Sequence, residues 1–351
     1  MRIHLGSILA ISLLIGCSSR GSPTHSFNVY SENGIIVAES SGGPKYTEEL
    51  FEYEAYLHLQ QDETLPESLF SRPFGFSMDS DGWYYILDGA EDRIVVFSPD
   101  GQFSHSIGRS GNGPGEFQGP RYLSVYQENV SVYDGSLRRV SRFDRMGTFI
   151  SSKSLSNQPF STLTAHVGPR DELICIVRRL VMEPQDADPY TVLTANIFSS
   201  DGDSIAAIDT PKMLNGNPQA DYAPGLGIYV IGGNDPWIKW FNLEGALTRI
   251  VRISETQHVG GEPDQPWWGL VQVEEDGKIW ARIPSELGYQ DPDSHIYRLL
   301  SSEGEYLGDT KCPKMPWYFM NGFVLAFEDY PSDISPVVYR LKPAVQGFRF
   351  K

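Results

Sequence analysis

The chain has 351 residues, of which 40% are hydrophobic and 12% aromatic, a composition typical of a globular protein with a sizeable core and not of a disordered chain. Lysine and arginine together number 28 and aspartate and glutamate 45, so the formal net charge is −17. Binding of nucleic acid requires a concentrated basic surface, and this charge argues against it. Three cysteines are too few for a disulfide framework, and no CxxC spacing or histidine-rich run indicates a zinc site.

The N-terminal residues predict export from the cytoplasm. Arg2 precedes an apolar run from Leu5 to Ile15, which is too short to span a bilayer because a helix needs about 20 residues to do so. The run ends in Leu14-Ile15-Gly16-Cys17, which resembles the lipobox of bacterial lipoproteins. The resemblance implies that residues 1–16 are a signal peptide and that Cys17 carries a lipid anchor. No aspartate follows the cysteine, which in such lipoproteins favours the outer membrane.

Residues 17–45 are interpreted as a tether and N-terminal segment, because the first of them are small and polar. Beyond them, apolar and polar side chains alternate from Phe51 to Gln60, with apolar residues at the odd positions. This alternation predicts one half-buried strand.

From about Pro73 onward, the chain repeats a unit in which a β-rich run ends in an apolar residue and a glycine follows four positions later. Five copies keep this spacing: Phe97 with Gly101, Phe143 with Gly147, Phe198 with Gly202, Phe241 with Gly245 and Leu300 with Gly304. A sixth run, Val337 to Leu341, has the strand but lacks the glycine. The ends of the runs lie 46, 55, 43, 59 and 41 residues apart, which is typical of four-stranded propeller blades.

Short turns support this architecture. Asp-Gly pairs separate the predicted strands, as in the hairpin expected at Asp79 to Gly82, and no long amphipathic helix occurs between residues 70 and 345. Residues 46–351 are therefore predicted to form an all-β, six-bladed β-propeller of four-stranded antiparallel blades. The strand that starts at Phe51 can complete the last blade and remove an exposed sheet edge. Residues Gly347 to Lys351 compete for the same place, so the sequence leaves both closures open.

One segment resembles a known repeat. Residues Ile107 to Phe117 are rich in glycine and end in Gly-Pro-Gly-Glu-Phe, and they are followed by Val132-Tyr133-Asp134 and Arg142-Phe143-Asp144. This pattern resembles the NHL-type repeat and the six-bladed propeller lipoproteins of bacteria, most strongly over residues 73–150. The glycine-rich stretch is interpreted as a connector between blades and not as a phosphate loop, because no Lys-Ser/Thr pair and no helix follow it.

The lengths of the connections suggest which face of the ring binds a partner. Connections assigned to one face are short, whereas five on the opposite face are long: residues 179–190, 209–222, 256–265, 283–294 and 328–336. Loops on a rigid scaffold commonly carry function, so the long-loop face is the candidate binding face. In or beside these loops lie Trp237, Trp267, Trp268 and Trp317, which are suited either to recognition or to packing between blades.

Other candidate residues are fewer. Arg121 and Tyr122 follow the glycine-rich connector and face either the central channel or the blade interior. Asp291 and Asp293, and likewise Asp186 and Asp188, have the spacing of oxygen ligands for calcium, and propeller hydrolases that resemble the gluconolactonase group use that ion. No other cofactor is expected, and no catalytic residue is assigned, because GxSxG, HExxH and Walker motifs are missing.

Together these features favour a lipid-anchored, extracytoplasmic binding module over an enzyme. Such a module would sit at the outer membrane and recognise a protein, peptide or glycan through its long-loop face. The alternative is a calcium-dependent propeller hydrolase or lyase of the lactonase type. Neither hypothesis names the ligand.

Overall fold

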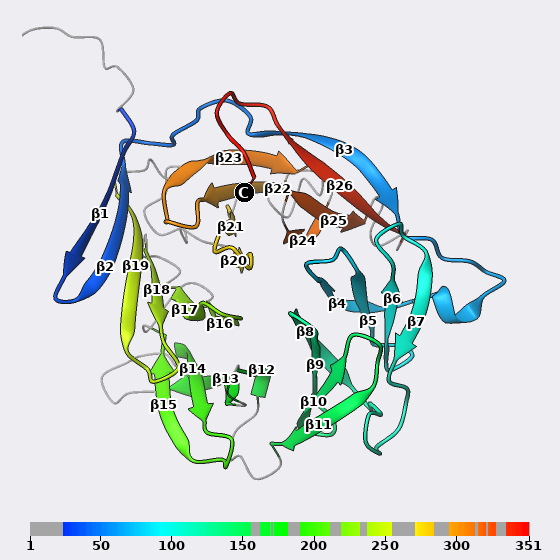
Figure 1. Cartoon of the computed structure of the whole chain (residues 1–351). Helices are drawn as coiled ribbons and strands as arrows, with labels where there is room; N and C mark the ends of the chain where they lie inside the picture. Colours follow the sequence, from blue (N-terminus) through cyan, green and yellow to red (C-terminus); the bar gives the residue numbers. More distant parts are fainter. Residues whose placement is uncertain are drawn as a thin grey trace, which may run out of the picture.

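The computed structural model describes residues 24–155, 162–168, 170, 172–181, 190–210, 219–231, 237–254, 271–283, 295–312, 315–320, 322–327 and 335–350. Six four-stranded antiparallel units surround a central channel, which confirms the predicted six-bladed β-propeller (Figure 1). Among the described residues the helical structure is the single 3₁₀ turn η1 (Pro66–Ser68), and no helix there is long and apolar enough to cross a membrane.

The strands of each blade follow one another from the channel outward. The first blade contains β4 (Pro73–Met78), β5 (Tyr84–Asp88), β6 (Arg93–Phe97) and β7 (Phe103–Ile107). The second contains β8 (Pro120–Tyr126), β9 (Asn129–Asp134), β10 (Arg139–Asp144) and β11 (Phe149–Ser154), and the third β12 (Thr162–Val167), β13 (Leu173–Val181), β14 (Tyr190–Phe198) and β15 (Ser204–Asp209). The fourth contains β16 (Gln219–Ala223), β17 (Gly227–Ile231), β18 (Trp237–Phe241) and β19 (Leu247–Ser254), and the fifth β20 (Val271–Val273), β21 (Ile279–Arg282), β22 (His295–Leu300) and β23 (Tyr306–Cys312). The sixth contains β24 (Met315–Met320), β25 (Phe323–Phe327), β26 (Pro336–Pro343) and, as its outer strand, β3 (Phe51–His58).

The repeated glycine lies in the turn between the third and fourth strands of five blades. In the first blade, Gly101 has a φ of 79°, a left-handed conformation that glycine adopts without steric cost. Its N–H donates to the Ser98 carbonyl over 2.8 Å, and the Ser98 N–H donates to the Gln102 carbonyl over 2.9 Å. The same pair of bonds and a positive φ recur at Gly147, Gly202, Gly245 and Gly304. One local turn geometry therefore explains the sequence repeat.

Ring closure explains why the sixth repeat lacks this glycine. Strand β3 pairs antiparallel with β26, from Phe51 opposite Pro343 to His58 opposite Val337, so of the two closures that the sequence left open, the early strand completes the last blade. The last blade needs no hairpin there, because its fourth strand comes from the start of the chain. The competing C-terminal segment forms no strand up to Phe350. Instead, the rings of Phe348 and Phe350 pack on Phe51 at 5.2 and 5.3 Å between centroids.

The core consists of apolar clusters between neighbouring blades. Between the fifth and sixth blades, the rings of Trp280 and Phe319 stack with their centroids 4.1 Å apart. Cys312 belongs to this cluster, and Cys175 to the cluster between the second and third blades. Both thiols are buried and free, as expected of small apolar residues, and burial raises the pKa of each to about 12. Neighbouring blades are therefore held together by packing around the whole ring.

The glycine-rich connector packs between the first and second blades, in agreement with its interpretation. Phe117 is fully buried and makes an edge contact with Phe143, with ring centroids 5.6 Å apart. A Cβ atom at Gly108 would lie 2.2 Å from the Phe117 ring, so only glycine allows this close approach. The Glu116 carboxylate accepts from the Gly113 N–H over 2.9 Å and closes the loop on itself.

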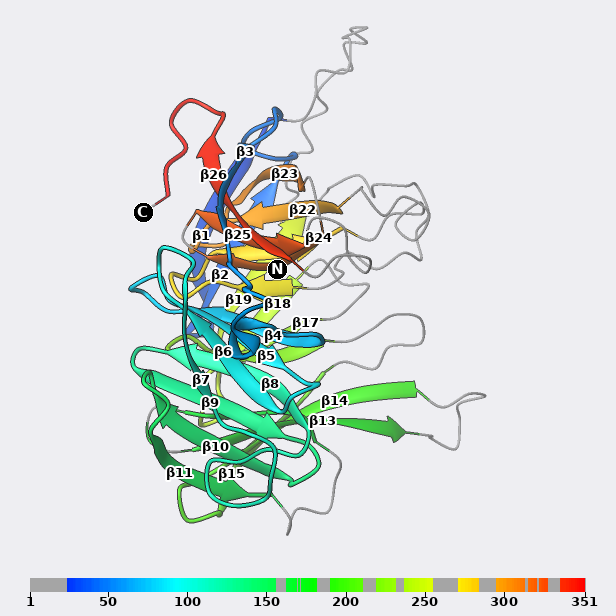
Figure 2. The ribbon, with the colours of Figure 1, turned by 90° about the vertical axis from the view of Figure 1, so that its right-hand side faces the viewer.

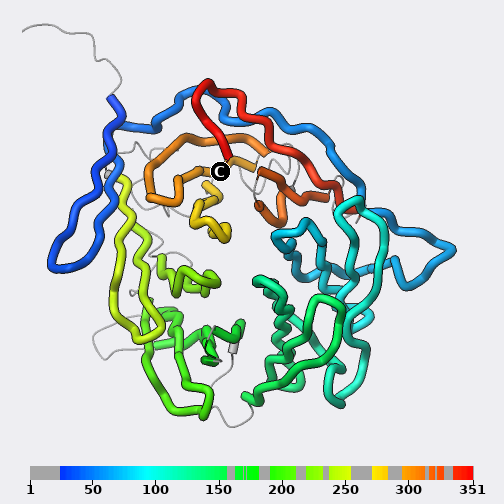
Figure 3. The backbone as a smooth tube through the Cα atoms, in the orientation of Figure 1, coloured from blue at the N-terminus to red at the C-terminus, as the bar shows by residue number. Residues whose placement is uncertain are grey.

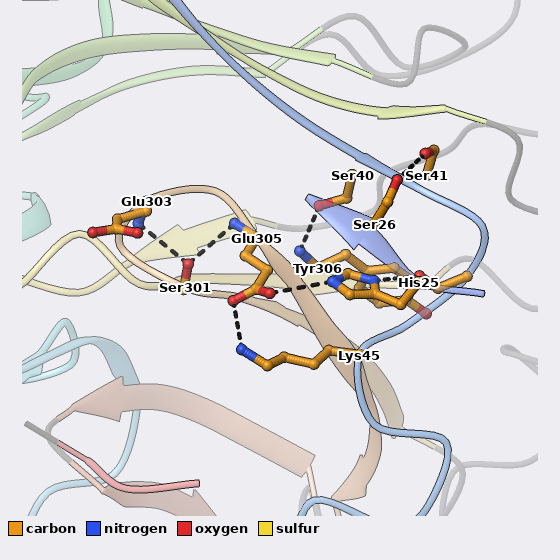
Figure 4. Close-up of polar contacts among 10 residues, drawn as sticks. His25, Ser26, Ser40, Ser41, Lys45, Ser301, Glu303, Glu305 and Tyr306 are labelled. Atoms are coloured by element: carbon orange, nitrogen blue, oxygen red, sulfur yellow. Dashed lines mark hydrogen bonds and ion pairs between the residues drawn. The ribbon is translucent and has the colours of Figure 1, made fainter. Parts of the chain in front are cut away.

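The N-terminal segment contains a hairpin that the sequence did not predict. Strands β1 (Ser26–Glu32) and β2 (Ile35–Ser41) extend the fourth blade to six strands, because β2 pairs parallel with β19. Figure 4 shows how the fifth blade holds this segment: the Glu305 carboxylate lies 2.9 Å from Lys45 Nζ and 3.2 Å from His25 Nε2. The Tyr306 N–H also donates to Ser40 Oγ over 2.9 Å.

From the hairpin, the chain passes along the outside of the fifth blade before it enters β3 (Figure 3). The N–H groups of Lys45 and Tyr46 donate to the carbonyls of Tyr306 and Leu307 in the outer strand of that blade. The N-terminal segment is therefore part of the outer wall of the propeller.

In the side view, β13 and β14 project beyond the other strands on one face of the ring (Figure 2).

Candidate functional site in the central channel

A cavity of about 250 Å³ occupies the central channel. It is lined by residues of the innermost strands β4, β8, β16, β20 and β24, by residues of the turns that follow β16 and β20, and by Tyr229 of β17. Seven of its 21 lining residues are aromatic, and its charged residues are Arg121, Asp221, Glu274 and Glu275. Pockets that combine aromatic walls with a few convergent polar groups are typical of ligand sites.

The position of each charged residue along its strand indicates its depth in the channel. The innermost strands all run the same way, from the face where blades are joined to the face of the short turns. Arg121 is the second residue of β8 and lies near the first face, whereas Glu275 follows the end of β20 and lies near the second. Asp221 is the third of five residues in β16 and lies between them. The described charges are therefore separated along the channel axis.

A polar cluster joins three blades at the middle of the channel. His166 on β12 is 2% exposed, and its Nε2 lies 2.9 Å from Asp221 Oδ1 on β16. The Tyr122 hydroxyl on β8 donates to Asp221 Oδ2 over 3.4 Å. The His166 ring packs edge-on against Tyr122 and Tyr222, with centroids at 4.5 and 5.5 Å. His166 Nδ1 is buried and has no hydrogen-bond partner among the described residues.

Burial raises the pKa of the tyrosines that line the channel cavity. It raises the pKa of Tyr222 and Tyr318 to about 12 and the pKa of Tyr122 and Tyr229 well above the usual value of 10.0. These phenols are therefore neutral at physiological pH and retain hydroxyl groups that donate. Partial withdrawal from water, and secondly the negative charge of Asp79, raise the pKa of the Glu275 carboxyl.

A second cavity, of about 170 Å³, adjoins the first. It shares Ser124, Tyr222 and Pro224 with the channel cavity and extends towards the second and third blades. Its lining includes Arg142, whose Nη2 donates to Asn129 Oδ1 over 3.1 Å. A ligand in the channel thus has a polar side pocket beside it.

The cavity brings together three of the residues singled out from the sequence. Arg121, Tyr122 and Trp317 all line it. Trp317 also packs between blades, with edge contacts to Phe76 at 5.6 Å and Phe327 at 5.2 Å, which is one of the two roles that the sequence left open.

Trp237 lies elsewhere, at the start of β18, where Lys239 Nζ is 4.1 Å from its ring centroid. Cys17, Trp267, Trp268, Asp291 and Asp293 lie outside the described residues, as do Asp186, Asp188 and most of the long-loop positions.

The predicted hairpin at Asp79 to Gly82 is confirmed. Asp79 Oδ1 accepts the N–H groups of Asp81 and Trp83, each over 3.0 Å, and Oδ2 accepts the Tyr85 hydroxyl over 3.0 Å. The Asp79 carboxylate therefore serves the turn. Within the described part of the chain, no three His, Cys, Asp or Glu side chains are grouped so that they could hold a metal ion.

Three residues of the site were not found from the sequence: His166, Asp221 and Glu275. Asp221 and His166 are 55 positions apart and meet only when the ring forms. Asp221 was expected in the long connection 209–222, whereas it lies on the innermost strand β16, where side chains can face the channel. The blade borders after residue 150 lack the glycine-rich connector, so the innermost strands there were not located from the sequence.

Comparison with known proteins agrees with the fold. A protein described as exported from Bacteroides fragilis has 14% sequence identity and a TM-score of 0.55, over 88% of this chain and 100% of the other. A member of the DUF4221 family from Bacteroides vulgatus has 13% identity and a TM-score of 0.55, over 84% of this chain and 99% of the other. At such identities the likeness concerns the fold alone.

Sequence comparison with curated proteins finds no match. The model of one protein family, DUF5128, which is described as a 6-bladed beta-propeller, matches residues 28–216, more than half of the chain. The chain therefore belongs to the DUF5128 family of 6-bladed beta-propellers.

Proposed function

We propose that this protein is an extracytoplasmic, lipid-anchored binding module that recognises a protein, peptide or glycan. The ligand approaches through the long-loop face, and one of its groups enters the channel cavity. The observation that carries the proposal is this cavity of about 250 Å³, in which aromatic walls surround Arg121, Asp221 and Glu275. Aromatic surface supplies contact area, and a few polar groups fix orientation, which is the usual design of a recognition site.

The proposed lipid anchor at Cys17 rests on the resemblance of the N-terminal residues to a lipoprotein signal peptide. Acylation at Cys17 leaves a short tether between the membrane and β1, which lies on the outer wall of the fourth blade. The propeller is then held close to the membrane while its channel stays open to ligands outside the cytoplasm.

The second candidate function is an enzyme, a hydrolase or lyase of the lactonase type that uses calcium. The observation that favours catalysis is the contact of 2.9 Å between His166 and Asp221 beside the cavity. A histidine oriented by a carboxylate is a common general base. Arg121 and Glu275 at opposite ends of the channel suit either function, so an assay must separate the two.

A cavity-filling substitution tests the binding proposal. Ser124 lines both cavities and is partly buried, so Ser124→Trp places an indole where the ligand would lie. The matched control is Ser152→Trp, on the exposed outer strand of the same blade. Wild type and both variants are applied to peptide and glycan arrays, and their melting temperatures are compared.

We expect some ligands to bind the wild type and Ser152→Trp but not Ser124→Trp, while the three proteins have similar melting temperatures. Equal binding by all three proteins would remove the channel from the site. Each retained ligand is then incubated with the wild type, with and without calcium, and analysed by mass spectrometry. Calcium-dependent turnover would replace the binding module with the enzyme.

A further inference from the structure

The walls of the channel cavity combine neutral aromatic rings with carboxylates. Trp317 and Tyr318 from β24, Tyr122 from β8, and Tyr222 and Tyr229 from the fourth blade all line it. The faces of these aromatic rings carry the negative potential that attracts cations. Aromatic rings beside a carboxylate are the arrangement that proteins use for ammonium and guanidinium groups.

Asp221 has acceptor capacity to spare. Its Oδ1 faces His166 Nε2 at 2.9 Å and the Tyr222 N–H at 2.8 Å, whereas the one contact of Oδ2 with another described residue is the long one of 3.4 Å with the Tyr122 hydroxyl. An ionised carboxylate accepts about four hydrogen bonds. The side chain is 28% exposed, so Oδ2 can accept another donor from the cavity.

No lysine or arginine of the described residues pairs with the Asp221 carboxylate, which faces the ring of His166. Arg121 is exposed near the face where blades are joined, and its stem lies against Gly135, where a Cβ atom would be 3.1 Å from it. Among the described residues, no ion pair joins Arg121 to Asp221 or Glu275. The described lining carries one arginine against the carboxylates of Asp221, Glu274 and Glu275, of which Glu274 already faces Lys278 Nζ at 3.9 Å.

His166 supplies a second, independent observation. It is 2% exposed, and its Nδ1 lacks a partner among the described residues while Nε2 is directed at Asp221. A buried polar group normally has its hydrogen bonds satisfied, and exceptions concentrate at functional sites. The contact of Nε2 with Asp221 holds the carboxylate in a fixed orientation in the channel.

We propose that the channel cavity binds an ammonium or guanidinium group of the ligand, with Asp221 as the carboxylate that accepts its hydrogen bonds and Tyr122 and Trp317 as aromatic walls. Glu275 contributes negative charge at the short-turn end. This inference rests on the proposed binding function and names the chemistry of the group that enters the channel.

The test measures binding of methylguanidinium chloride to the full chain by saturation-transfer NMR, with methylurea as the neutral molecule of the same shape. We expect saturable binding of methylguanidinium and none of methylurea at the same concentrations. Asp221→Asn keeps the shape of the residue and an acceptor oxygen for His166, and it should weaken methylguanidinium binding at least about tenfold. Asp201→Asn, on an exposed turn outside the channel, is the matched control and should bind as the wild type does.

Glu275→Gln is the second variant, because this exposed side chain can change without disturbing the fold, and we expect it to weaken binding about twofold to threefold. Two further test ligands distinguish whether the cationic group belongs to a peptide or to an amino sugar. N-acetyl-arginine amide represents a peptide, and glucosamine, compared with N-acetylglucosamine, represents an amino sugar. Binding of either that Asp221→Asn weakens supports the proposal.

Equal binding of methylguanidinium and methylurea, or equal losses in Asp221→Asn and Asp201→Asn, would overturn the proposal. Displacement of methylguanidinium by micromolar calcium would also overturn it, because the carboxylate would then serve a metal. Failure of this inference is distinct from failure of the binding function. If neutral array ligands bind the wild type and not Ser124→Trp, the binding function stands although this inference fails. If Ser124→Trp loses no array ligand, the binding function and this inference both fail.

Discussion

Ring closure by β3 can be tested at one side chain, because Phe51 on this strand packs on Trp280 of the fifth blade and on Phe348 near the C-terminus. Phe51 is 2% exposed, and its ring centroid lies 5.7 Å from that of Trp280 and 5.2 Å from that of Phe348. Replacement of a buried phenylalanine by alanine removes apolar contact and leaves a cavity, which costs about 3–5 kcal/mol. Phe51→Ala should destabilise the propeller by this amount.

The expected change in melting temperature follows from the size of the domain. Unfolding entropy of about 2.1 cal/mol/K per residue, over roughly 300 residues, converts a loss of about 3–5 kcal/mol into a decrease of about 5–8 °C. Differential scanning calorimetry of the wild type and Phe51→Ala measures this shift. Glu52→Ala is the matched control, since Glu52 is the next residue of β3 and is exposed, and it should change stability by less than about 0.5 kcal/mol.

A double-mutant cycle then tests the role of the C-terminal segment. Phe51→Ala combined with Phe348→Ala should show a coupling energy of roughly 0.5–3 kcal/mol, because the two rings are in contact. Equal melting temperatures for Phe51→Ala and Glu52→Ala would refute closure through a buried β3. Additive effects of the two phenylalanine replacements would show that the C-terminal residues do not cover this strand.

Two further predictions concern the anchor and a pH-dependent contact. Cys17→Ser should release the mature chain from the membrane fraction, because burial of acyl chains at about 0.8 kcal/mol per methylene holds it there, and a variant that still sediments with membranes would contradict lipidation. The Gly113 N–H and then the Arg109 guanidinium lower the pKa of Glu116 below its ordinary 4.5, so this carboxylate stabilises the fold above that pH and loses the effect as the pH falls through the folded-state value. In urea unfolding, Glu116→Gln should therefore be less stable than the wild type at pH 7, and the difference should vanish in acid. The control variant Glu128→Gln, at an exposed residue, should behave as the wild type at both pH values. A stability difference for Glu116→Gln that persists in acid would argue against a charge effect.

The site was only partly predictable from the sequence. Arg121 and Tyr122 were found because the glycine-rich connector marks the start of β8. They line the channel cavity, which is one of the two positions that the sequence allowed for them. Trp317 was chosen for its position beside a connection, yet it lies on the innermost strand of its blade. Asp221 and His166 carry no local motif, and their contact depends on the placement of three blades around one channel.

The sequence by itself determined the number of blades and the turns within them, because each turn depends on residues within a few positions of one another. Gly101 and its four counterparts impose the same left-handed turn wherever they occur, and strand alternation is equally local. Only the tertiary structure decided which terminal segment closes the ring and where the N-terminal hairpin lies. The pairing of β2 with β19 joins Ile36 to Arg249, and that of β3 with β26 joins Phe51 to Pro343. Such pairings depend on packing between segments far apart in the chain, and no pattern within either segment specifies its partner.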